Sequence, residues 1–161
     1  VSDIIQKSNK RYASTNFVIP FEALTFEKRI SEGASGVVFK GVWNSSPVAI
    51  KKIKVAEEEE SFIKEVSILN YLRHANIVLF CGVSIDAKMN KYIVCEFVAG
   101  GSLDRLLYHP SKSKNIMLTF SDKVRILGDI CRGMIYLHSL SPPIVHRDLV
   151  CIHICYHWLT G

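Results

Sequence analysis

Two glycines, Gly33 and Gly36, stand between stretches rich in β-branched and aromatic residues, and this pattern most constrains what the chain can fold into. The stretches Arg29–Lys40 and Trp43–Ile53 are predicted to be strands around a glycine-bearing turn. Apolar residues follow Gly36 directly, so a strand–turn–strand flap is favoured over a turn that leads into a helix. Because glycine has no side chain, its backbone amide can approach an anion closely. The pattern therefore fits a flap over phosphates, and an ordinary hairpin turn is the alternative.

A lysine lies inside an apolar strand pattern, in the sequence Val48–Lys51. Burying an ammonium group alone is costly, so Lys51 either reaches the surface or has an anionic ligand and a carboxylate partner. The acidic run Glu57–Glu60 predicts the start of a helix, because negative charge complements the helix dipole there. Glu65 lies on this helix, on the same face as Leu69, and is the candidate partner of the lysine.

The segment that follows the glycine flap and the lysine strand alternates between helix and strand patterns. The helix that carries Glu65 is predicted to end near Arg73 and His74, which stand where its last turn is expected. Two further strands are predicted at Ile77–Val83 and Lys91–Phe97, with the polar residues between them forming a hairpin loop. The second of these strands runs into glycines, and backbone groups exposed at such a strand end can pair with a ligand.

The last part of the chain is predicted to be helical. Ala99–Gly101 breaks the strand pattern and is interpreted as a hinge, and Ser102–Tyr108 as a short helix. Ser121 is the predicted N-cap of a long helix that ends before Pro142. The apolar stripe of this helix is Val124, Leu127, Ile130, Met134 and Leu137. Strands followed by helices in this order predict an α+β fold.

Composition excludes several classes of protein. The chain has 161 residues, of which 48% are hydrophobic and 22% charged, which is typical of a globular protein. Its net charge of +5 comes from scattered lysines and arginines, so no nucleic-acid binding is expected. No apolar run reaches the roughly 18 residues of a membrane helix, and the first residues lack the apolar core of a signal peptide. We therefore expect a cytoplasmic protein with no membrane partner, whose five cysteines are buried free thiols.

Four motifs occur in the order and spacing of a eukaryotic protein kinase domain, and the chain resembles the N-terminal part of such a domain. The motifs are the glycine flap, the strand lysine, the helix glutamate and the sequence HRD at residues 146–148. The phrases IPFEAL at Ile19–Leu24 and LRHANIV at Leu72–Val78 resemble the tyrosine-kinase-like group, relatives of Raf and the mixed-lineage kinases. The resemblance covers residues 17–149.

The resemblance implies an N-lobe, made of an antiparallel sheet and one regulatory helix, followed by the first helices of an incomplete helical C-lobe. Residues 1–16 are then a linker or N-terminal arm, and residues 17–98 are the N-lobe. Residues 99–149 are the hinge and the start of the C-lobe, up to the HRD motif. Residues 150–161 are a divergent tail, interpreted as foreign sequence from a misread splice boundary or a shifted frame.

The same resemblance implies roles for single residues. Lys51, held by Glu65, is expected to bind the α- and β-phosphates of ATP. Asp148 is expected to accept or orient the proton of the substrate hydroxyl. The residues expected to surround ATP are Ile30, Gly33, Ala34, Ser35, Gly36, Val38, Ala49, Lys51, Cys95, Glu96, Val98 and Ser102.

The pattern departs from the family after Leu149. Val150 stands where the family has a lysine, and His153 stands where it has a magnesium-binding asparagine, although imidazole suits Mg²⁺ poorly. Mg²⁺ is expected for the complete family domain, but no metal ligand is predicted in this chain. Zinc is not predicted either, because on a strand the alternating side chains would form a row rather than a tetrahedron. These side chains are Cys151, His153, Cys155 and His157.

The predicted function is that of a protein kinase, which transfers a phosphoryl group from ATP to serine or threonine hydroxyls, with tyrosine as an open alternative. This chain alone is expected to be inactive, because phosphoryl transfer relies on charge neutralisation by a bound metal. The alternative is a non-catalytic, pseudokinase-like module that binds a nucleotide or a partner. A kinase or scaffold partner would dock on the apolar stripe of the long helix. The protein substrate is unknown.

Overall fold

The computed structural model describes residues 17–33, 36–54, 59–108, 118–147, 149 and 155. They belong to two compact units. The first unit combines the chain up to residue 73 with residues 79–97, and the second combines residues 74–78 with the chain from residue 98 onward. The predicted arm at residues 1–16 and the predicted tail, apart from Cys155, lie outside the described residues.

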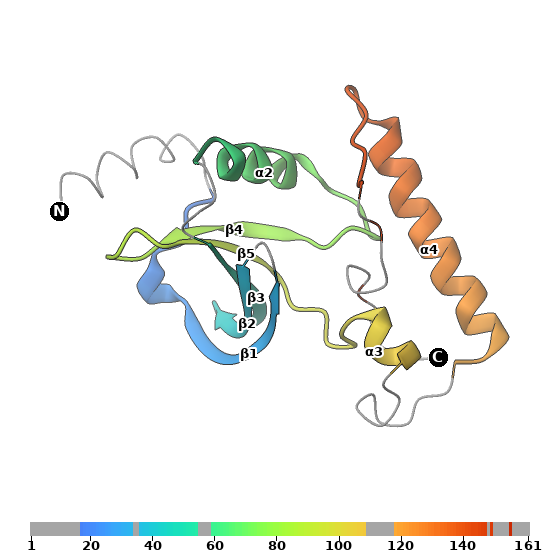
Figure 1. Ribbon diagram of the computed structural model, residues 1–161, viewed down its shortest axis with the longest axis horizontal. Coiled ribbons are helices and arrows are strands. Elements are labelled where there is room, and N and C mark those ends of the chain that lie inside the picture. The colour runs from blue at the N-terminus through green and yellow to red at the C-terminus, as the bar shows by residue number, and fades with distance from the viewer. Residues whose placement is uncertain are drawn as a thin grey trace. The chain divides into compact units, whose positions relative to one another are not determined.

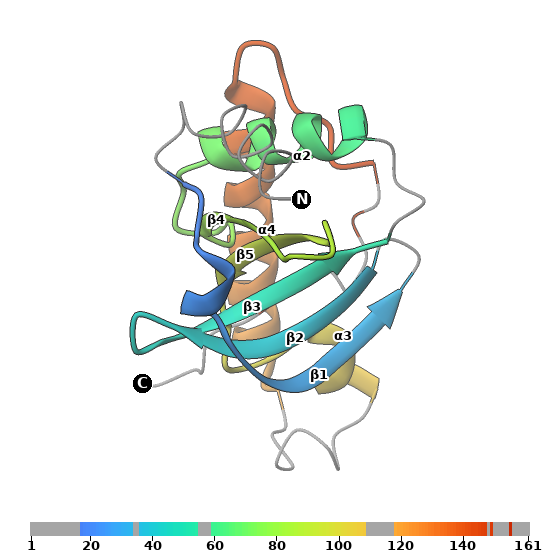
Figure 2. The ribbon, with the colours of Figure 1, turned by 90° about the vertical axis from the view of Figure 1, so that its left-hand side faces the viewer.

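The first unit is built on a five-stranded antiparallel sheet with the strand order β1-β2-β3-β5-β4. Its strands are β1 (Thr25–Gly33), β2 (Gly36–Trp43), β3 (Ser46–Ile53), β4 (Phe80–Ile85) and β5 (Lys91–Glu96). Figure 2 shows the long strands β1, β2 and β3 lying side by side. The sheet and its accompanying helices confirm the predicted α+β fold class.

The first strands have bounds that differ from the prediction. The stretch Arg29–Lys40 holds parts of two strands, because the chain reverses at the glycines, and β1 already begins at Thr25. Trp43 ends β2 instead of opening β3. Asn44 and Ser45 have φ values of 47° and 62°, so they form a two-residue hairpin turn directly after it.

Helix α2 (Glu59–Tyr71) covers one face of the sheet, as Figure 1 shows beside β4. Its first turn carries Glu59 and Glu60, in agreement with the prediction from the acidic run. The helix ends at Tyr71, so Arg73 and His74 lie beyond its last turn. The prediction that they form this last turn is therefore wrong.

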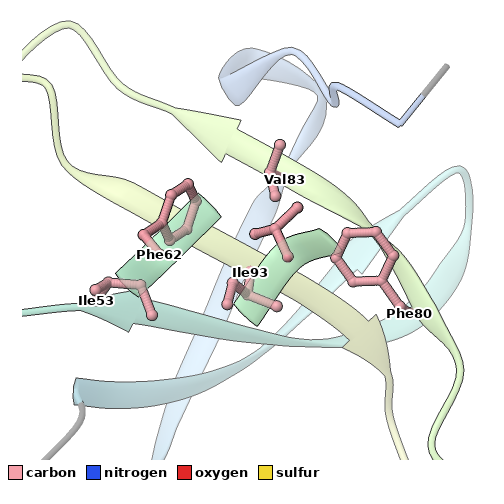
Figure 3. Packing of buried hydrophobic residues seen from close by; sticks show 6 residues of the cluster. Ile53, Phe62, Phe80, Val83 and Ile93 are labelled. Atoms are coloured by element: carbon pink, nitrogen blue, oxygen red, sulfur yellow. The ribbon is translucent and has the colours of Figure 1, made fainter. Parts of the chain in front are cut away.

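Each face of the sheet buries an apolar cluster. The helix-side core lies under α2 and consists of Ile53, Phe62, Val66, Phe80, Val83 and Ile93. Figure 3 shows the Phe62 ring of α2 next to Ile53 and Ile93 of the sheet. The opposite face is covered by the segment Phe17–Leu24, which we call the N-terminal strap and which includes the 3-10 helix η1 (Phe21–Ala23); its first residue, Phe17, packs instead against the helix-side core. The strap-side core consists of Ile19, Leu24, Val48, Ile50, Tyr92 and Val94.

The loop between β4 and β5 is organised by one carboxylate. Asp86 accepts hydrogen bonds from the backbone N–H groups of Lys88 and Asn90, from the Asn90 side chain and from the Tyr92 hydroxyl, at 2.7–2.9 Å. Burial acts to raise the pKa of Asp86, but these hydrogen bonds outweigh it and hold the pKa below its usual range. The ionised carboxylate therefore stabilises the folded hairpin.

We expect Asp86→Ala to lower the free energy of unfolding by about 1–3 kcal/mol at neutral pH, because an ionised hydrogen-bond acceptor is lost. The folded-state pKa of Asp86 is lowered, so its contribution is present above the unfolded-state pKa of about 3.9 and disappears as the pH falls through the folded-state pKa. Urea denaturation at neutral and acid pH measures the difference, with the exposed Glu22→Ala as a control. An equal destabilisation at both pH values would contradict this role of Asp86.

The second unit contains the helices α3 (Leu103–Tyr108) and α4 (Phe120–Ser139). The N-cap of α4 is Thr119, whose side chain accepts the Asp122 N–H while the Asp122 side chain accepts the Thr119 N–H. The predicted N-cap, Ser121, is therefore wrong, because this residue already lies in the first turn. Among the described residues, no helix is both long enough and apolar enough to cross a membrane.

The apolar stripe predicted on α4 is only partly buried. Leu137 is buried, but Val124 is 51% and Leu127 is 61% exposed. Ile126 and Gly133, which were not part of the predicted stripe, are buried instead. The buried face of α4 thus lies beside the predicted stripe, and the exposure of Val124 and Leu127 agrees with the prediction that the stripe is free to dock a partner.

Residues 74–78, which follow α2 in the sequence, pack on α4 within the second unit. The Asn76 side chain donates a hydrogen bond of 2.8 Å to Asp129, and the His74 ring stacks on Tyr136 with 4.8 Å between the ring centroids. The Asn76 backbone N–H also donates to Nδ1 of His74 at 3.1 Å. These contacts explain why the predicted strand Ile77–Val83 is shorter and begins as β4 only at Phe80.

Candidate functional site

A lysine and a glutamate from different elements meet on one face of the sheet. Lys51 of β3 and Glu65 of α2 form an ion pair with 3.0 Å between Nζ and Oε1. Their side chains are 25% and 33% exposed, so the pair is half-buried and can still be reached by a ligand. Because an ammonium group has three donors, the ion pair leaves Lys51 with the capacity to bind an anion.

The strand register places other predicted site residues on the same face as Lys51. Val38 of β2 pairs directly with Lys51, and Ala49 of β3 pairs with Cys95 of β5. Ala49 is two residues away from Lys51 on one strand, so the two side chains share a face. Ile30 lies on the neighbouring strand β1. The sheet thus brings together a cation, two small apolar side chains and a thiol.

The hairpin between β1 and β2 leaves open space beside Gly33. A Cβ atom added to Gly33 would meet no atom within 4 Å, whereas one added to Gly36 would lie 2.1 Å from the Lys52 carbonyl oxygen. Gly36 has a φ of 150°, and its close approach to β3 admits no side chain. The open backbone at Gly33 and the ammonium of β3 fit an anionic ligand such as a phosphate chain. Ala34 and Ser35, at the tip of the hairpin, lie outside the described residues.

The thiol of Cys95 lies near the ion pair and stays protonated. Burial is the main cause, and the nearby Cys81 and Glu65 act in the same direction, while Lys51 opposes them. The net effect of these groups is to raise the pKa of Cys95 to about 12. At neutral pH this residue is therefore a small neutral group on the sheet face and not a nucleophile.

The end of β5 is fixed by a side-chain contact that no sequence pattern signals. The Glu96 carboxylate accepts the Leu79 N–H at 2.8 Å, and the Glu96 N–H donates to the Leu79 carbonyl at 2.9 Å. The backbone N–H of Glu96 is therefore occupied within the fold. The two residues are 17 positions apart, so only the folded sheet brings them together.

The second unit carries the other predicted site residues. Val98 is buried, and Ser102 forms an isolated β-bridge with Cys155. Asp148 and His153 lie outside the described residues, so their roles stay predictions. In the part of the chain that the structure describes, no cluster of histidine, cysteine, aspartate or glutamate could hold a metal ion.

Comparison with known proteins identifies the family. A sequence model of the family described as protein tyrosine and serine/threonine kinase matches residues 24–157. The match includes the sheet, α2, α3 and α4, and it continues past Leu149 into residues predicted to be a divergent tail. ATP and Mg²⁺ are the general cofactors of this family, and proteins are its substrates.

Several curated relatives are similar over most of this chain. A probable serine/threonine-protein kinase of Dictyostelium discoideum is 45% identical over 130 residues, which are 78% of this chain and 12% of the relative. The serine/threonine-protein kinase CTR1 of Arabidopsis thaliana is 40% identical over 135 residues, 81% of this chain and 16% of the relative. The serine/threonine-protein kinase TNNI3K of Mus musculus is 35% identical over 140 residues, 84% of this chain and 16% of the relative.

The chain thus spans only a small part of the length of these relatives. Their names agree with the predicted tyrosine-kinase-like group, which is mostly specific for serine and threonine. The family model covers nearly the whole described structure, from the first strand of the sheet to beyond α4. The chain belongs to the protein kinase family.

Proposed function

We propose that the whole protein transfers the γ-phosphoryl group of ATP to serine or threonine hydroxyls of other proteins, and that this chain supplies the nucleotide-binding part of the site. The observation that carries the proposal is the Lys51–Glu65 ion pair, which lies on the sheet face that also presents Val38 and Ala49. The choice of serine and threonine over tyrosine rests on the names of the relatives.

The residues of the first unit have complementary tasks in this proposal. Lys51 donates to phosphate oxygens, and Glu65 fixes the position of its ammonium group. Val38 and Ala49 offer a flat apolar surface against which an adenine ring can lie. The backbone beside Gly33 has room to approach the phosphates. When bound with the nucleotide, Mg²⁺ supplies charge neutralisation in this family.

Asp148 is the proposed base or orienting group for the substrate hydroxyl, by its place in the HRD sequence. The residues after it support a second candidate function, because Val150 and His153 replace the lysine and asparagine of the family pattern. A hydrophobic residue cannot neutralise a phosphoryl group, and imidazole is a poor ligand for Mg²⁺. The second candidate is a non-catalytic module that binds nucleotide without transferring phosphate.

Thermal unfolding of the chain with ATP, with and without Mg²⁺, tests both candidates. A ligand that binds only the folded state stabilises it by about 2.7 kcal/mol at 100 times its Kd, so a saturable rise in the unfolding temperature is expected. AMP, which lacks the phosphates that Lys51 is proposed to bind, should give a smaller rise. Because this chain alone is expected to be inactive, phosphate transfer is assayed with the whole protein. Transfer from labelled ATP to casein would support the kinase, and binding of ATP by the whole protein without transfer would support the second candidate. A chain with no saturable response to ATP would contradict both.

A further inference from the structure

We propose that Phe17 is a positioning residue for the Lys51–Glu65 ion pair. The N-terminal strap docks beside β4 and places Phe17 in contact with Phe80. This contact fixes the position of α2 on the sheet, so that Glu65 lies within reach of Lys51. The inference rests on the proposed function of the ion pair. The strap lies just before Leu24, where the match to the family model starts.

The strap pairs with the edge of the sheet through one isolated β-bridge. β4 is the edge strand in the order of the sheet, and Val18 pairs with Val83 in a parallel bridge. The Ile19 N–H donates to the Val83 carbonyl at 2.8 Å, and the Val83 N–H donates to the Phe17 carbonyl at 2.9 Å. Ile19 is only 3% exposed. The strap is therefore bound through its backbone and through a buried side chain, and it covers an edge that would otherwise be open.

A glycine in β4 makes this close approach feasible. A Cβ atom added to Gly82 would lie 2.3 Å from the Phe17 carbonyl oxygen and 2.9 Å from Cδ1 of Ile19. The first of these atoms belongs to the backbone and cannot rotate away. An alanine at this position must therefore displace the strap from β4, while no residue of the ion pair is changed.

The ring of Phe17 reaches the core under the helix that carries Glu65. Its centroid lies 5.6 Å from that of Phe80 in an edge-to-face arrangement, and Phe80 is 4% exposed. Phe80 packs in the helix-side core with Phe62 and Val66 of α2, and Val66 is the residue next to Glu65. Because packed cores transmit displacements instead of absorbing them, losing the Phe17 ring is expected to let α2 shift.

The strap also offers a matched control on the other face of the sheet. Phe21 packs on Tyr92 and Phe26, with 5.2 Å and 5.6 Å between the ring centroids, in the strap-side core. Removing its ring perturbs the same strap and the same sheet. It does so on the face that is turned away from α2 and the ion pair.

The first experiment measures the Kd of a fluorescent ATP analogue for the full chain and its variants. Phe17→Ala is expected to weaken binding about three- to tenfold, and Gly82→Ala should do the same, while Phe17→Leu and the control Phe21→Ala stay near the parent value. In the background of Glu65→Ala, Phe17→Ala should have no further effect, because α2 then has no side chain with which to hold Lys51. An equal effect of Phe17→Ala in both backgrounds, or of Phe17→Ala and Phe21→Ala, would overturn the proposal.

The second experiment separates failure of this inference from failure of the proposed function. Hydrogen exchange of the α2 amides needs no nucleotide, and Phe17→Ala is expected to speed their exchange more than Phe21→Ala does. If the parent chain binds no ATP analogue, the proposed function fails, and faster exchange of α2 in Phe17→Ala alone still supports the positioning of the helix by the strap. Unchanged exchange of α2 in Phe17→Ala and Gly82→Ala would overturn it.

Discussion

Phe62→Ala is expected to lower the free energy of unfolding of the first unit by about 3–5 kcal/mol, the usual cost of truncating a buried aromatic ring. Phe62 has no exposed surface and lies in the middle of the helix-side core, between α2 and Ile53 and Ile93 of the sheet (Figure 3). The Lys91 ammonium also lies 5.2 Å from the centre of its ring, so a cation–π contact is lost with it.

Urea denaturation followed by circular dichroism measures this loss. Tyr71→Ala is the matched control, because it removes an aromatic ring from the same helix at a position that is 70% exposed. We expect the control to change the free energy of unfolding by less than about 0.5 kcal/mol. Similar losses in the two variants would mean that α2 is not anchored through the helix-side core.

The packing of Phe62 also affects the ion pair between Lys51 and Glu65. Phe62 and Glu65 are three residues apart on α2, so their side chains lie on neighbouring parts of the helix surface. The buried ring fixes the rotation of the helix about its axis, and this rotation decides whether Glu65 points toward Lys51. A helix that is loosened in its core should therefore lose the 3.0 Å ion pair before the strands separate.

Much of the first unit was predictable because its signals are local. Alternating apolar residues give the strands, and the acidic run before Phe62 gives the start of α2. Lys51 and Glu65 could be proposed as partners from their place on these elements. The distance of 3.0 Å between their charged atoms could not be predicted, because it depends on how α2 packs on the sheet.

The errors have equally specific causes. Ser121 has the side chain of an N-cap, but Thr119 and Asp122 form the reciprocal capping pair, a signal that the sequence does contain. The turn at Asn44 and Ser45 has no glycine, and Asn44, a residue type that tolerates positive φ, is its one local signal. The buried face of α4 is set by residues 74–78, which lie against Gly133, and by α3, which packs on Ile126, and no pattern within α4 itself signals these contacts.

Lys51→Ala is expected to weaken the binding of ATP about tenfold to a hundredfold, the effect of losing a charge-assisted hydrogen bond. Glu65→Gln should have a smaller effect, since its amide oxygen can still accept from the lysine. The free energy of unfolding should fall by about 1–2 kcal/mol in Lys51→Ala, because the half-buried Glu65 loses its partner, and by less in Glu65→Gln. Titration of a fluorescent ATP analogue and a parallel urea denaturation measure the two quantities.

Lys52→Ala is the control that shows whether ATP binds to Lys51 itself or only to the positive charge of the sheet. It removes the same charge from the next residue of β3, but successive side chains of a strand point to opposite faces, so Lys52 points away from α2. If ATP were attracted only by the positive charge of the sheet, the two variants would weaken binding equally. A selective loss in Lys51→Ala would place the phosphates on the face that holds Glu65, Val38 and Ala49. That face also borders the helix-side core. Lys51 would then link the affinity for the nucleotide to the position of α2 on the sheet.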